Sequence, residues 1–236
     1  MTTELKTRSL ESSGGHHTGL SDRALAGWEI ASVVFSFLAA EWVATNAAEY
    51  TRAIMGIPVA AAIFIVILSH KLRSESIRDI GFRFDNFLKA LSVLVVPSIV
   101  AALLCLFLAW RLGTSINFLR WHPNRFLPLQ LGVGFCWALV QQYVLQGFIN
   151  RRAMILVGRG WRSIFITAAI FGALHLPNIW LMLITFAGGL VWAAIYQRVP
   201  NLFALAVSHA VMTWFIVSTL PTTALHRLRV GLGYFF

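Results

Sequence analysis

The sequence predicts an all-α, polytopic membrane protein, a transmembrane bundle of about seven helices. Only 12% of its residues are charged and 58% are apolar, whereas soluble chains carry roughly 25% charged residues. The apolar residues form blocks of about 20, the length of helix that crosses a hydrocarbon core of ~30 Å. Basic residues gather between the blocks, as topology signals do. We therefore expect an integral, multi-pass protein, in the plasma membrane if the host is bacterial.

The elements follow one another with few interruptions. Residues 1–26 are polar and lack an apolar period, which predicts a disordered cytoplasmic tail. The predicted spans are 28–48, 53–69, 87–110, 127–149, 163–178, 180–197 and 201–220. Two spans and a turn must fit between 163 and 197, so we expect one or both to be short. Residues 223–236 are predicted to be a short C-terminal tail.

The formal charge of +10 comes from short basic stretches between the apolar blocks. No basic stripe with interleaved aromatic residues is present, so we expect no nucleic acid partner. Anionic lipid headgroups are the expected partner of these residues. A cytoplasmic N-terminus places about twice as many lysines and arginines inside as outside, which favours that orientation. Arg151 and Arg152 are interpreted as one such signal, solvated at the cytoplasmic surface.

Polar side chains inside the predicted spans indicate where function resides. A polar group in hydrocarbon is costly unless it finds a partner, so such residues are functional candidates. The candidates form four clusters: Glu41; Gln141, Gln142 and Gln146; His175 and Asn178; His209 and Thr213.

Three of these clusters lie at one depth. Gln141, His175 and His209 are about 15, 20 and 16 Å from the nearest cytoplasmic basic residue at 1.5 Å per residue. If their helices are neighbours, the three side chains form one site. Phe171 lies one turn before His175 and Asn178 three residues after it, so we expect all three to line one cavity.

The glutamines divide between two faces of their helix. Gln142 and Gln146 are four residues apart, so their amides are predicted to hydrogen-bond to each other. Gln141 points about 100° away from Gln142, toward the two histidines.

The stretch from Ala138 to Trp214 resembles the CAAX protease and bacteriocin-processing family (CPBP, or Abi) of intramembrane endopeptidases. The motifs of that family are Glu-Glu-x-x-x-Arg-Gly, Phe-x-x-x-His and His-x-x-x-Asn. The matching residues here are Gln141-Gln142-Tyr-Val-Leu-Gln146-Gly147, Phe171-Gly-Ala-Leu-His175, and His209 with Thr213. The resemblance implies N-terminal transmembrane helices over 27–125 and a catalytic core over 126–222.

In that family the first glutamate and the second-motif histidine activate water against a peptide carbonyl. The third-motif histidine and asparagine stabilise the oxyanion. The resemblance therefore places Gln141 at the position of the base, with His175 beside it, and gives His209 and Thr213 the oxyanion role. Gln142 and Gln146 replace a glutamate–arginine pair, which leaves no unpaired charge there; they, Phe171 and Asn178 are supporting residues.

The first motif departs from the family in its chemistry. A glutamine can orient water but cannot take its proton, and losing a general base costs roughly 10²–10⁴-fold in rate. Residues 86–236 contain no Asp or Glu. Two solutions stay open: a carboxylate from an early helix, for which Glu41 is the candidate, or His175 as the base with Gln141 orienting the water. Glu41 can also be interpreted as a packing carboxylate that pairs with Asn46.

The leading hypothesis is an intramembrane CAAX-type endopeptidase that hydrolyses a peptide bond of a membrane-associated substrate. The alternative is a pseudoprotease that binds a hydrophobic or lipidated peptide without cutting it. A third interpretation has His175 and His209 bind haem or a metal. Two histidines are too few ligands for a preformed zinc site, so we expect no metal and no cofactor. The expected partners are membrane lipid and a membrane-associated peptide or protein.

Overall fold

The structure, a computed structural model, describes residues 21–43, 49–120 and 127–235. All regular secondary structure in these ranges is helical and none is strand, which confirms the all-α prediction. The helices are α1 (Asp22–Val43), α2 (Glu49–Leu72), α3 (Ile77–Ile80), α4 (Phe87–Arg111), α5 (Leu127–Gln142), α6 (Arg151–Val157), α7 (Trp161–Ala173), α8 (Ile179–Arg198), α9 (Leu202–Thr219) and α10 (Thr222–Leu225). A π-helix, η2 (Tyr143–Asn150), joins α5 to α6, and two 3₁₀ turns, η3 (His226–Leu228) and η4 (Gly231–Phe235), follow α10.

A helix occupies every predicted span. Among the described residues, four helices (α1, α4, α8 and α9) are long and apolar enough to cross a membrane, and two shorter stretches are also apolar helices: Gly56–Leu72 within α2, and α7. The chain is thus a multi-pass integral membrane protein. As expected for the crowded region, α7 is short, with 13 residues. Helix α1 begins at Asp22, so the end of the predicted tail is helical; residues 1–20 of that tail lie outside the described ranges.

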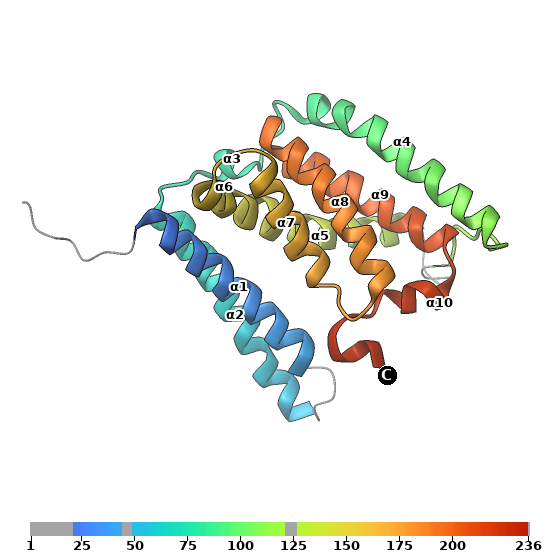
Figure 1. The fold of residues 1–236 in the computed structure, drawn as a ribbon, viewed down its shortest axis with the longest axis horizontal. Helices are drawn as coiled ribbons and strands as arrows, with labels where there is room; N and C mark the ends of the chain where they lie inside the picture. The colour runs from blue at the N-terminus through green and yellow to red at the C-terminus, as the bar shows by residue number, and fades with distance from the viewer. Residues whose placement is uncertain (1–20, 44–48, 121–126, 236) are drawn as a thin grey trace, which may run out of the picture.

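The helices are arranged around a central group of α5, α7, α8 and α9 (Figure 1). Helix α4 packs along α9 on one side, and α1 pairs with α2 and packs against α6 on the other. On α4, Val96, Val100 and Leu103 are 60–68% exposed. In water such a surface would be unfavourable, but in a bilayer it faces lipid tails.

The central helices approach closely because small residues lie between them. A Cβ atom added to Gly189 of α8 would lie 3.0 Å from the Cα atom of Ala168 in α7. The π-helix η2 is buried from Leu145 to Asn150. Short π segments inside α-helices are frequent at functional sites, and this one directly follows the two glutamines of the first motif.

A buried ionic cluster connects α1, α2 and α6 at the predicted cytoplasmic edge. Arg152 is fully buried and pairs with Glu75 at 2.7 Å and with Glu29 at 3.2 Å, while Arg151 pairs with Glu75 at 2.6 Å. The prediction that both arginines are solvated is therefore wrong. The prediction failed because the carboxylates that pair with these arginines come from segments far away in the sequence. Burial by itself raises the pKa of Glu75, but hydrogen bonds from His70, Arg152 and Arg151 outweigh it and hold that pKa well below its usual range.

The C-terminal segment, residues 222–235, is folded back onto the molecule. The backbone N–H of Gly231 donates to the carbonyl of Leu176 at 2.8 Å, and η4 packs against α1. The predicted short tail is therefore an ordered part of the fold, positioned between α1 and the turn that precedes α8.

Candidate functional site

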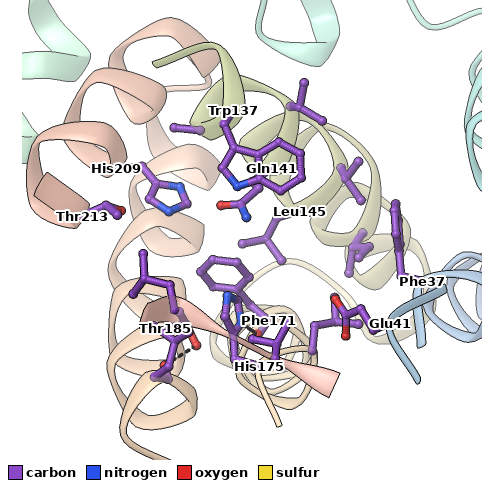
Figure 2. A pocket seen from close by; sticks show the side chains of 18 of the residues that line it. Phe37, Glu41, Trp137, Gln141, Leu145, Phe171, His175, Thr185, His209 and Thr213 are labelled. Atoms are coloured by element: carbon purple, nitrogen blue, oxygen red, sulfur yellow. Dashed lines mark hydrogen bonds between the residues drawn. The ribbon is translucent and has the colours of Figure 1, made fainter. Parts of the chain in front are cut away.

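One cavity of about 330 Å³ collects most of the predicted site residues. It is lined by α1, α5, η2, α7 and the turn after it, α8, α9 and the C-terminal segment, and Figure 2 shows its labelled side chains. The wall is mainly apolar. Its polar side chains are Glu41, Gln141, His175, Thr185, His209 and Thr213. The expectation that three helices bring Gln141, His175 and His209 to one place agrees with this cavity.

His175 lies in the turn just after α7, where the helix ends at Ala173. Its Nδ1–H donates to the backbone carbonyl of Phe171 at 2.7 Å. Because a carbonyl can only accept, Nδ1 carries the proton and Nε2 keeps its lone pair. The Phe171 ring meets the imidazole edge-on, with centroids 4.9 Å apart, and fixes its plane. His175 therefore presents a basic nitrogen.

His209 lies on α9 and has the opposite hydrogen-bonding arrangement. The amide Nε2 of Gln142 donates to its Nδ1 at 3.2 Å. Nδ1 is then the acceptor, so the proton is on Nε2, which becomes a donor. The ring stacks on Trp192, with centroids 4.5 Å apart, and meets the edge of Phe171 at 5.9 Å. Phe171 thus contacts both histidines.

The buried amides behind the cavity differ from prediction. Gln142 and Gln146 are both fully buried. The predicted bond between them is wrong, because Gln142 bonds to His209 and the Gln146 Oε1 atom accepts from Asn150 at 2.8 Å. Asn150 in turn accepts from Gln197 Nε2 at 2.9 Å. Sequence reasoning missed Asn150 and Gln197; the signal for Asn150 is its place four residues after Gln146, within the same apolar block.

Asn178 does not line the cavity as predicted. Its Oδ1 atom accepts from the backbone N–H of Leu181 at 3.1 Å and so caps α8. Its Nδ2 group donates to the carbonyls of Leu225 at 2.9 Å and Arg229 at 3.4 Å. Asn178 therefore holds the C-terminal segment against the turn that carries His175.

Two further contributions come from outside the resembling segment. Glu41 of α1 lines the cavity, and its Oε2 atom is buried with no hydrogen-bond partner among the described residues. Asn46, the partner considered for Glu41, lies outside the described ranges. Leu228 and Val230 of the C-terminal segment also line the cavity. No sequence signal marked these two, because an apolar pair after the last span looks like part of a tail.

The described residues contain no group of three or more His, Cys, Asp or Glu side chains that could hold a metal ion. What the cavity offers is a basic nitrogen on His175, a donor on His209, a hydroxyl on Thr213 and an amide on Gln141. These groups suit an addition of water to a carbonyl, in which one group receives a proton and others stabilise a developing oxyanion.

Comparison with known proteins agrees with the motif resemblance. Residues 123–215 match the family model described as type II CAAX prenyl endopeptidase Rce1-like. This range contains Gln141, His175, His209 and Thr213 but ends before the C-terminal segment and excludes α1. A search of curated proteins and a search of solved structures each gave no match.

Proposed function

We propose that this protein hydrolyses a peptide bond in a membrane-associated polypeptide. The match of residues 123–215 to the family model described as type II CAAX prenyl endopeptidase Rce1-like supports this proposal. The observation that carries the proposal is the complementary state of the two imidazoles. His175 offers a lone pair, and His209 offers an N–H, at one cavity. A hydrolase needs both functions at the same carbonyl.

The proposed reaction assigns a role to each group. The Gln141 amide orients a water molecule, and Nε2 of His175 takes its proton as the oxygen attacks the carbonyl carbon. The carbonyl oxygen becomes an oxyanion that accepts hydrogen bonds from His209 Nε2–H and the Thr213 hydroxyl. The carbon–nitrogen bond then breaks, and His175 returns the proton to the leaving amine. The products are a carboxylic acid, which then releases its proton to water, and an amine.

A supporting role is proposed for the buried residues around these groups. Gln142 keeps the proton of His209 on Nε2, and Phe171 orients both rings. Gln146 fixes the π-helix through Asn150. The largely apolar wall of the cavity suits a hydrophobic segment of the substrate.

The test is cleavage of a library of membrane-tethered peptides by the purified full-length protein, followed by mass spectrometry. We expect cleavage by the parent and a loss of at least ~100-fold in His175→Ala, because the proton acceptor is removed. Cleavage that is unchanged in His175→Ala would reject the proposal.

A second candidate function is binding without cleavage, favoured by the amide at position 141. On this account the parent binds a hydrophobic or lipidated peptide but leaves it intact, and Gln141→Glu gains cleavage. The same library decides between the two functions, since measurable His175-dependent cleavage by the parent excludes a pseudoprotease.

A further inference from the structure

One acidic side chain, Glu41, is present among the described residues that line the cavity, and the proposed reaction gives it no role. Glu41 reaches the cavity from α1, outside the segment that carries the three motifs (Figure 2). It lies about 18 Å along α1 from Glu29 of the ionic cluster at 1.5 Å per residue. This depth matches that of Gln141, His175 and His209, so the carboxylate enters the same layer of the membrane.

Within the part of the chain that the structure describes, the Glu41 carboxylate has one oxygen without a hydrogen-bond partner. Its Oε2 atom is buried and accepts no hydrogen bond from the described residues. The described cavity lining contains no lysine or arginine, and its only groups able to become cationic are His175 and His209. Burying an unpaired carboxylate is strongly unfavourable. The carboxylate and the two imidazoles line the same cavity, so a positive charge that forms on His175 during the reaction arises in the cavity that holds Glu41.

The end of α1 is also held in place. Gly231 of the C-terminal segment has a φ of +55°, and a Cβ atom there would lie 2.5 Å from the backbone oxygen of Glu41. The same Gly231 donates to Leu176, next to His175 in the chain. The C-terminal segment thus joins the helix turn that bears Glu41 to the turn that bears His175.

From these observations we infer that Glu41 supplies the negative charge that the first motif lacks. It stabilises the imidazolium formed when His175 takes the proton of the attacking water, and the charge on His175 disappears when the proton passes to the leaving amine. Glu41 is thus a positioning and charge-stabilising residue that acts through His175. The inference rests on the proposed hydrolysis and assigns its missing carboxylate to another helix.

The test compares kcat and KM of four proteins on a peptide that the parent cleaves: parent, Glu41→Gln, Glu41→Asp and the double variant Glu41→Gln/Gln141→Glu. We expect Glu41→Gln to lower kcat by roughly 10²-fold with KM within about threefold, because only the charged state of the reaction loses stabilisation. The double variant returns a carboxylate at position 141 and should recover at least about tenfold of the lost kcat. Asp22→Asn, an exposed acid at the start of the same helix, is the control and should match the parent.

Each outcome decides the inference. The Glu41→Asp variant keeps the negative charge on a shorter side chain, whereas Glu41→Gln keeps the shape without the charge. If the Gln variant is as active as the Asp variant, the function of Glu41 does not depend on its charge. Full activity of Glu41→Gln beside a His175-dependent parent rejects the inference and leaves the proposed hydrolysis standing. A loss that the double variant does not recover shows a structural role and also rejects it. A parent without cleavage rejects the proposed hydrolysis itself, and the inference with it.

Discussion

At the scale of single residues, the two histidines are distinguished by the atoms that bond to Nδ1. A backbone carbonyl binds His175 there and a side-chain amide binds His209. Identical side chains thereby present a lone pair in one case and a donor in the other. The motif positions alone do not predict which nitrogen of each histidine carries the proton, because the proton's position depends on Gln142 and on the local backbone.

We predict that Gln142→Leu lowers kcat by about tenfold with little change in KM. The variant leaves Nδ1 of His209 without its hydrogen-bond donor, so the imidazole proton can move from Nε2 to Nδ1. The loss of kcat should stay below the roughly 10²–10³-fold cost of deleting an oxyanion donor. Steady-state cleavage kinetics measure this effect. Gln197→Leu removes another buried amide, one that bonds to Asn150 and Ser163 and does not contact His209, so it should lower kcat less than Gln142→Leu does. Equal losses in both variants would contradict the role of Gln142.

The sequence predicted which residues come together in one cavity better than it predicted their hydrogen-bond partners. Gln141, His175, His209 and Thr213 share one cavity, as the depth argument required. The contacts of Gln142, Gln146 and Asn178 differed, because hydrogen-bond partners such as Asn150, Gln197 and Leu225 are chosen by tertiary packing. A helical spacing shows which side chains share a face, but not which neighbouring helix meets that face.

At the scale of elements, two asparagines begin adjacent long helices in the same way. Asn178 caps α8 by accepting from Leu181 N–H at 3.1 Å, and Asn201 caps α9 by accepting from Ala204 N–H at 2.9 Å. Only Asn178 also donates to the C-terminal segment, through Leu225. The helix positions were predictable from apolar blocks, but this second role of a cap was not.

We predict that Asn178→Ala and Asn201→Ala each destabilise the protein by about 1–2 kcal/mol, the usual cost of losing a helix N-cap. Only Asn178→Ala should also speed amide hydrogen exchange in residues 222–235, because it removes that segment's side-chain anchor. Thermal unfolding in detergent and hydrogen-exchange mass spectrometry measure the two effects. Equal exchange in the two variants would contradict the anchoring role.

At the scale of the whole molecule, the ionic cluster ties the α1–α2 pair to the core. Arg152 is fully buried between Glu29 and Glu75. No pattern in the sequence indicated that this arginine would meet carboxylates so far away along the chain. Transmembrane helices are predictable from sequence, because every backbone group in hydrocarbon must be hydrogen-bonded within its own segment. Which helices become neighbours is not predictable in the same way, since it depends on contacts between residues far apart in the sequence.

We predict that Glu75→Gln destabilises the protein by about 3 kcal/mol at pH 7, because breaking a buried pair leaves charge on Arg152 less compensated. The folded state holds the pKa of Glu75 below its ordinary value of 4.5. Its contribution is therefore fully present above that pH and is lost as the pH falls below it. Thermal midpoints of the parent and the variant in detergent should thus differ at pH 7 and converge in acid. Asp85→Asn, which alters an exposed carboxylate, should change the thermal midpoint much less. A difference in midpoint between parent and Glu75→Gln that stays constant down to strongly acidic pH would contradict this role of Glu75.

The central claim is that water attacks a peptide carbonyl in the cavity, with His175 as its proton acceptor. The most direct measurement is mass spectrometry of a membrane-tethered peptide incubated with the purified protein in water enriched in the heavy isotope ¹⁸O. The account predicts two fragments, one heavy oxygen atom in the new carboxylate, and the loss of both fragments in His175→Ala. A peptide that binds but stays intact, or fragments whose new carboxylate contains no heavy oxygen, would contradict it.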